Sequence, residues 1–174
     1  MESTNETKLF RPWNFWYIIP DRSTNIDANW RDFLHSLCSI ESVEDIWSTL
    51  NAIEPAHKLP KGCRYYVFKK GVLPLWEDRS NINGYEISIE HQISGSKKAN
   101  VTERWIDVIL ACLGETLTQS KLVNGIEFSV RAQNYKIGIW TAPCEEEEVQ
   151  SISADLKKLT NWQSEVKVIQ IKNK

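Results

Sequence analysis

Two neighbouring segments, residues 126–132 and 136–141, alternate strictly between apolar and polar side chains, and this alternation constrains the fold more than any other feature. The apolar positions are, in order, Ile126, Phe128, Val130, Ile137 and Ile139. Because successive side chains of a strand point to opposite faces, each segment predicts a strand with one apolar face. The short connection Gln133-Asn134-Tyr135 favours a β-hairpin. Helices are expected to cover the apolar face.

The opposite face of this hairpin collects polar side chains together with an indole. Arg131, Lys136 and Trp140 fall on it, next to Glu127 and Ser129. With the helices on the other side, we expect this face to stay open and to present two cations and one aromatic ring. A solvated outer face that carries one isolated tryptophan is the alternative interpretation.

The rest of the pattern predicts an α+β fold, in which an antiparallel sheet carries helices on one face. Further strands are expected over residues 13–19, 64–69, 85–91 and 166–171. Helices are expected over a short segment, 31–38, and over three longer ones, 43–53, 100–113 and 145–160. Loops are expected over 20–29, 71–83 and 95–100. Residues 1–8 are interpreted as a short disordered tail and residues 9–174 as a single domain.

Local signals mark the ends of the longer helices. Ser42, followed by acidic residues, predicts an N-cap. Asn100-x-x-Glu103 resembles a capping box, and Gly114 is the expected C-cap of that helix. The acidic run 145–148 lies in the first turn of the last helix, where it complements the helix dipole. We therefore interpret this run as a solvated helix end and not as a docking patch.

Charge and cysteine usage exclude several classes of protein. The net charge is −2, whereas proteins that coat long nucleic acids are strongly basic, so any contact with RNA has to come from a small local site. The four cysteines and three histidines are scattered, so no metal or other cofactor is expected. No apolar run approaches the roughly 20 residues of a membrane helix, and the polar start does not resemble a secretory signal. A cytoplasmic location is expected.

Tryptophan is the unusual feature of the composition, with eight in 174 residues. Trp30 and Trp76 lie among polar residues, which is atypical of core positions. The pair Trp76-Glu77 places an indole beside a carboxylate, a combination suited to an aromatic cation that carries N–H donors. Trp30 can supply a second indole. A loop tryptophan that closes the edge of the core is the alternative.

A series of short motifs runs in order from about Leu9 to Ile171. They are Trp13-Asn14-Phe15-Trp16, Trp30, Ser42-Val43-Glu44-Asp45-Ile46-Trp47, Leu59-Pro60-Lys61-Gly62-Cys63, Tyr66-Val67-Phe68-Lys69-Lys70-Gly71, Pro74-Leu75-Trp76-Glu77-Asp78, Arg104-Trp105-Ile106-Asp107, Cys112-Leu113-Gly114-Glu115, Ser129-Val130-Arg131-Ala132 and Lys136-Ile137-Gly138-Ile139-Trp140-Thr141. In order and spacing they resemble those of the eukaryotic translation initiation factor 4E family, which binds the messenger RNA cap. The resemblance implies a curved antiparallel sheet backed by three α-helices on its convex face. It also implies a binding module and not an enzyme.

The resemblance assigns roles to six residues. Trp30 and Trp76 resemble the indoles that sandwich the 7-methylguanine base. Glu77 resembles the acceptor of the guanine N1–H and N2–H, with the backbone N–H of Trp76 directed at O6. Trp140 resembles the wall against the N7 methyl group. Arg131 and Lys136 resemble the phosphate ligands.

The family also binds helical peptides of 4G-type scaffold proteins and 4E-binding repressors on its convex side. The positions matching that surface are Val43, Trp47, Ile106, Asp107, Leu110 and Gly114. Both helices concerned are apolar on more than one side, which suits an apolar groove for an amphipathic helix. The alternative is that the second apolar stripe belongs to the core.

The chain departs from the family pattern near the expected phosphate site. Gln133 stands where a lysine is usual, and Tyr85-Glu86-Ile87 replaces a basic residue followed by tryptophan. We therefore expect fewer cations to contact the phosphates than is usual in the family, unless Arg11, Lys69 or Lys97 supplies a replacement charge. Two alternatives in function remain: a cap-binding translational repressor of the same fold, and a cap hydrolase. The second would need a metal-binding carboxylate cluster or a P-loop, and the sequence has neither.

Overall fold

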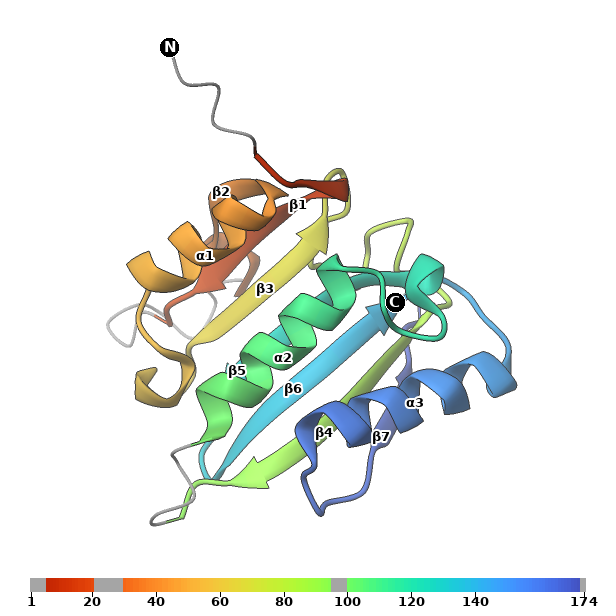
Figure 1. The fold of residues 1–174 in the computed structure, drawn as a ribbon. Coiled ribbons are helices and arrows are strands. Elements are labelled where there is room, and N and C mark those ends of the chain that lie inside the picture. Colours follow the sequence, from red (N-terminus) through yellow and green to blue (C-terminus); the bar gives the residue numbers. More distant parts are fainter. Residues whose placement is uncertain (1–5, 21–29, 95–99, 173–174) are drawn as a thin grey trace.

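A computed structural model describes residues 6–20, 30–94 and 100–172 and contains one seven-stranded sheet in the order β2-β1-β3-β5-β6-β4-β7 (Figure 1). All neighbouring strands pair antiparallel. The strands are β1 Lys8–Ile18, β2 Leu34–Ser42, β3 Arg64–Lys69, β4 Tyr85–Gln92, β5 Val123–Val130, β6 Asn134–Thr141 and β7 Lys167–Gln170. The helices are α1 Val43–Ala52, α2 Val101–Leu113 and α3 Glu146–Thr160, with 3-10 turns η1 Trp30–Phe33, η2 Ala56–Lys58 and η4 Ser120–Leu122. The predicted α+β class is confirmed.

The three α-helices lie on one face of the curved sheet, as predicted (Figure 1). Alternation explains this, because the apolar side of the β5–β6 hairpin packs into the same core as α2. Phe128 pairs with Ile137 in the hairpin, and its ring lies 5.7 Å from that of Trp105 on α2. The opposite face of the sheet holds a second, smaller apolar cluster of Ile18, Tyr66, Phe68, Trp140 and Ile171. The sheet is therefore covered on both sides at its centre.

The ends of the helices follow the local signals in part. A capping box starts α1: Ser42 Oγ accepts from the backbone N–H of Asp45 at 3.1 Å, and the Asp45 carboxylate accepts from the N–H of Ser42 at 3.0 Å. At the start of α3, the Glu148 carboxylate accepts from the backbone N–H of Glu145 at 2.9 Å. The predicted capping box of α2 is wrong, because Asn100 makes no side-chain capping bond. Gly114 is the C-cap as predicted.

The predicted helix over residues 31–38 is also wrong. Those residues form the turn η1 and the first half of β2. Strand β2 pairs with β1, Ile40 opposite Trp13 and Cys38 opposite Phe15. This long-range pairing outweighs the weak local helix pattern. Strand β1 starts at Lys8, inside the predicted tail, while residues 21–29 and 95–99 of the predicted loops lie outside the described residues.

Gly125 leaves room for the ring of Phe68, which belongs to the same aromatic cluster as Trp140. It lies in β5 opposite Phe68 of β3, and a Cβ atom at this position would overlap the fully buried Phe68 ring. Phe68 in turn packs edge-to-face against Trp140, with ring centroids 5.3 Å apart. A side chain at position 125 would therefore disturb the support of Trp140.

We predict that Gly125→Ala lowers the free energy of unfolding by about 1–3 kcal/mol, because the buried ring has to move. Urea unfolding at equilibrium measures this. Gly138→Ala, in the adjacent strand, is the matched control, since its new Cβ would lie 3.6 Å from Lys136 Cε and Ser88 Cβ, an ordinary contact. Equal stability of wild type and Gly125→Ala would contradict the packing argument.

Candidate functional site

A cavity of about 700 Å³ opens on the face of the sheet that lacks the helices. This volume suits a nucleotide-sized ligand. Its lining residues come from six strands and the adjoining turns: Ile18, Pro20, Phe33, Gly62, Arg64, Tyr66, Trp76, Glu77, Glu86, Glu127, Arg131, Lys136, Trp140, Ile169 and Lys172. The cavity combines an aromatic side with a charged floor.

Trp76 and Trp140 form the aromatic side of the cavity. Their ring centroids lie 6.5 Å apart with an interplanar angle of 75°. Trp140 is buried and packs edge-to-face against Tyr66 and Phe68. Trp76 is half-buried on the loop between β3 and β4, so part of its ring is available to a ligand.

The loop that carries Trp76 is held by side-chain hydrogen bonds that the sequence motifs did not predict. The fully buried Asn81 donates to the carbonyl oxygens of Leu73 at 2.9 Å and Leu75 at 2.8 Å. The Asp78 carboxylate accepts from the backbone N–H of Leu73 at 3.0 Å. These bonds fix the backbone on both sides of Trp76, so the indole is presented on a rigid support.

Glu77 lies at the mouth of the cavity, with its side chain about half exposed. Its carboxylate lies 3.5 Å from the Arg31 guanidinium, and the exposed fractions are 48% for the Arg31 side chain and 52% for Glu77. Ion pairs this exposed contribute little, so a ligand can displace Arg31 from Glu77. The contact also brings η1, which starts at Trp30, to the mouth of the cavity. The side chain of Trp30 lies outside the described residues, so its predicted stacking role stays a prediction.

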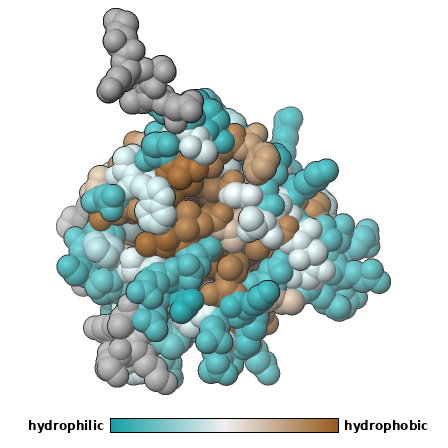
Figure 2. Space-filling model, viewed as in Figure 1, coloured by the Kyte–Doolittle hydropathy of each residue, from teal (hydrophilic) through white to brown (hydrophobic). Residues whose placement is uncertain are grey.

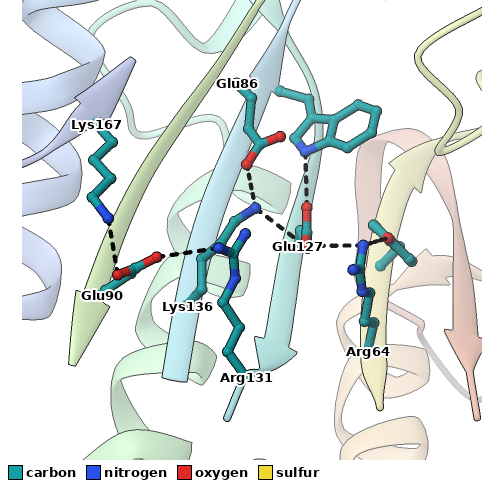
Figure 3. Close-up of polar contacts among 9 residues, drawn as sticks. Arg64, Glu86, Glu90, Glu127, Arg131, Lys136 and Lys167 are labelled. Carbon is teal, nitrogen blue, oxygen red and sulfur yellow. Dashed lines mark hydrogen bonds and ion pairs between the residues drawn. The ribbon is translucent and has the colours of Figure 1, made fainter. Parts of the chain in front are cut away.

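Lys136 forms the charged floor together with two carboxylates (Figure 3). Its ammonium donates a hydrogen bond to Glu86 and lies 3.4 Å from Glu127 Oε1. All three side chains are at most 6% exposed. Burial raises the pKa of the Glu86 carboxyl, repulsion from Glu127 adds to that rise, and Lys136 opposes it.

Arg64 and Tyr66 extend this network toward β3. Arg64 Nη1 lies 3.9 Å from Glu127 Oε1 and donates to the Tyr66 hydroxyl at 3.3 Å. Burial raises the pKa of Tyr66, so its phenol stays neutral. Glu127 also accepts a hydrogen bond from the Trp140 indole N–H at 3.2 Å. A single buried carboxylate thus contacts both the aromatic and the cationic parts of the site.

Arg131 lies at the rim, next to the turn of the β5–β6 hairpin. It pairs with Glu90 at 3.5 Å, and Glu90 also pairs with Lys167 at 3.0 Å (Figure 3). Gln133 is exposed in the same turn.

The replacement cations considered from the sequence lie elsewhere. Arg11 pairs with Glu115, Lys69 donates to the carbonyl oxygen of Lys121 at 3.0 Å, and Lys97 is outside the described residues. The extra cations that line the cavity are Arg64 and Lys172 instead.

Five of the six residues expected at the site line this one cavity: Trp76, Glu77, Trp140, Arg131 and Lys136. One expectation was wrong in part, because Lys136 and Trp140 on the polar face of the hairpin are buried, while Arg131 is exposed as expected. Lys136 is 4% exposed and Trp140 is 3% exposed. The aromatic cluster and the carboxylates of neighbouring strands cover them. No sequence pattern identified Arg64 or Tyr66 as a site residue. Glu86 was noted only as a departure from the family pattern, and Glu127 only as a polar position of the hairpin.

A second surface lies on the opposite side of the sheet, between α1 and α2. Trp47 is 43% exposed, so it is a surface residue, while Val43, Ile106 and Leu110 are half-buried. Figure 2 shows hydrophobic atoms gathered within a hydrophilic rim on this helix-bearing face. Asp107 pairs with Arg104 at 3.0 Å, and Gly114 ends α2. The alternative that the second apolar stripe belongs to the core is therefore wrong for Trp47.

Within the described residues, no group of three or more histidine, cysteine, aspartate or glutamate side chains is arranged to hold a metal ion. In that same part of the chain, no helix is long and apolar enough to cross a membrane.

The fold and cavity together define a binding module, with a tryptophan-lined cavity on one face of a curved sheet and helices on the other. The chain belongs to the eukaryotic initiation factor 4E family, whose model matches residues 8–173. It is 37% identical over 161 residues to eukaryotic translation initiation factor 4E of Candida albicans, covering 90% of this chain and 74% of that one. It is 35% identical over 140 residues to Drosophila melanogaster initiation factor 4E1, covering 80% of this chain and 52% of that protein.

The fold is shared with solved structures of related proteins. Ascaris suum eIF4E-3, in complex with the m7G cap, superposes with a TM-score of 0.85 at 27% identity and covers 95% of this chain and 91% of its own. Caenorhabditis elegans eIF4E-3, in complex with the 4E-binding protein Mextli and a cap analogue, gives a TM-score of 0.84 at 25% identity and covers 95% of this chain and 92% of its own.

Proposed function

We propose that this chain binds the 7-methylguanosine cap of messenger RNA in the cavity and recruits a 4G-type translation initiation scaffold through its helical face. The observation that carries the proposal is the half-buried Trp76 next to the exposed Glu77 carboxylate, in a cavity lined by Trp140 and cations. The similarity to an initiation factor solved with the m7G cap supports it.

The recognition of the base follows from its charge. Methylation at N7 makes guanine a cation, and an indole face attracts a cation by roughly 0.5–2 kcal/mol per contact. We assign Trp76 and Trp30 as the two stacking rings and Trp140 as the wall beside the N7 methyl group. Glu77 accepts from the guanine N1–H and N2–H, while the Trp76 backbone N–H meets O6.

The phosphate chain runs along the floor toward Arg131 and Lys136. Both cations line the cavity, and both are engaged with carboxylates in this structure. The phosphates therefore meet cations whose charge is partly offset, which supports a weaker phosphate contribution than two free cations would make.

The assigned roles are those of a binding module acting in the cytoplasm, where capped messenger RNA is translated. Glu77 is used to hold the edge of the base, and the sequence has no P-loop. Incubation of pure protein with m7GpppG should therefore release no nucleotide. Measurable cleavage would favour a cap hydrolase instead.

The helical face is the proposed docking surface for an amphipathic helix of the partner. The assigned contact residues are Val43 and Trp47 on α1, Ile106, Asp107 and Leu110 on α2, and Gly114 at the C-cap of α2. An exposed tryptophan beside half-buried aliphatic residues is typical of a binding hot spot.

A cap-binding translational repressor is the second candidate. The similarity to an initiation factor solved with the 4E-binding protein Mextli favours testing it. Capture of a 4G-type scaffold from translating extract supports initiation, whereas capture of a 4E-binding repressor without scaffold supports repression.

We predict that Trp76→Ala and Trp30→Ala each weaken binding of 7-methyl-GTP by about 1–3 kcal/mol, because each removes one stacking face. Glu77→Ala should cost at least as much, since two charge-assisted hydrogen bonds are lost. Isothermal titration calorimetry measures this, with Trp47→Ala on the far face as the control. Near-wild-type binding by folded Trp30→Ala would mean that another residue is the stacking partner of Trp76.

We predict that Trp47→Ala abolishes capture of a 4G-type helical peptide, because the exposed indole is the centre of the apolar surface. Its affinity for the cap should stay close to that of the wild type. Fluorescence anisotropy with a labelled peptide measures capture, and Trp76→Ala is the reciprocal control. Peptide capture that survives in Trp47→Ala would refute the assignment.

We predict a shallow dependence of cap affinity on salt, corresponding to roughly two phosphate contacts. Gln133→Lys should strengthen binding of 7-methyl-GTP and barely affect 7-methyl-GMP, since it adds a cation at the rim. Titrations of both ligands at two salt concentrations measure this, and Gln150→Lys on α3 is the control for added bulk charge. A steep gain in affinity with each added phosphate in the wild type would contradict the expectation that few cations contact the phosphates.

A further inference from the structure

The position of Lys136 sets it apart from an ordinary phosphate-binding lysine. Its ammonium is buried on the cavity floor between Glu86 of β4 and Glu127 of β5 (Figure 3). Lysine is seldom buried this deeply unless its charge is paired. In this site the pairing is supplied by the protein before any ligand arrives.

The carboxylates balance the cations of the floor. Glu86 and Glu127 carry two negative charges, and Lys136 and Arg64, which also faces Glu127, carry two positive ones. A phosphate that approaches Lys136 is attracted by the ammonium and repelled by two carboxylates within a few ångströms. Because these groups are buried, solvent screens that repulsion weakly.

We infer that Glu86 and Glu127 are specificity-determining residues, because they keep the charge of Lys136 paired within the protein. As a consequence, the affinity of the site for methylated guanine nucleotides depends only weakly on the length of their phosphate chain. This inference rests on the proposed cap-binding function. The two carboxylates act through Lys136 and are positioning residues, not ligand contacts.

Glu86 offers the cleaner test of the two. Glu127 also accepts from the Trp140 indole, so a change there can disturb the aromatic side. The hydrogen bond found for the Glu86 side chain in the described residues is the one from Lys136. Glu86→Gln keeps the shape and an acceptor for Lys136 while removing one negative charge from the floor.

The experiment measures the affinities of 7-methyl-GMP and 7-methyl-GTP by calorimetry at one ionic strength and takes their ratio, so that contributions from the base cancel. Glu86→Gln should raise the preference for the triphosphate by about three- to tenfold. Glu103→Gln, an exposed carboxylate on α2, removes the same charge far from the cavity and should leave the ratio unchanged. If Glu86→Gln does not fold, Glu127→Gln, which keeps an acceptor for Trp140, takes its place with the same expectation.

Lys136→Gln provides the second arm. Added to the Glu86→Gln background, it should remove the gain in triphosphate preference, because that gain comes from the Lys136 charge. An unchanged ratio in folded Glu86→Gln or Glu127→Gln overturns the inference, as does a gain that persists when Lys136→Gln is added to Glu86→Gln. A wild type that binds 7-methyl-GMP no better than GMP overturns the proposed function itself, and with it this inference.

Discussion

The site depends on one buried carboxylate, that of Glu127. It lies in the central strand β5 with 1% of its surface exposed, and burying a charge there is costly unless partners surround it. Lys136 and Trp140 from β6 and Arg64 from β3 supply those partners. The same contacts position Trp140 on the aromatic side and hold the Lys136 ammonium against protein carboxylates on the cavity floor. Glu127 therefore couples recognition of the base to recognition of the phosphates, although it contacts neither the base nor the phosphates in the proposed complex.

Much of the fold could be predicted because its signals are local. The alternation in the β5–β6 hairpin identified which side chains face the helices, and the Ser42 cap located the start of α1. Strand β2 was missed because its conformation is set by pairing with β1, which is distant in sequence and leaves only a weak pattern. Asn100 was assigned a cap from its spacing to Glu103, but spacing does not fix the backbone geometry that capping requires.

The site could be predicted as a set of residues but not as an electrostatic arrangement. Family motifs brought Trp76, Glu77 and Trp140 together, and the cavity contains all three. Alternation assigned Lys136 to the right face, yet it gave no information about what covers that face. The burial of Lys136 depends on its pairing with Glu86 and Glu127, which lie on strands two apart in the sheet. The hydrogen bonds from the Asn81 side chain that support Trp76 could not be predicted either, because their acceptors are backbone carbonyl groups, which leave no sequence pattern.

The central claim is that the cavity selects a cationic methylated base by stacking. Titration of the intrinsic tryptophan fluorescence with 7-methyl-GTP and with GTP tests it most directly, because the two ligands carry the same phosphates and differ in the charge of the base. The account predicts that 7-methyl-GTP quenches the fluorescence and binds at least about tenfold more tightly than GTP, as expected for cation–π contacts of roughly 0.5–2 kcal/mol on each ring. Equal affinities for the two nucleotides would contradict it.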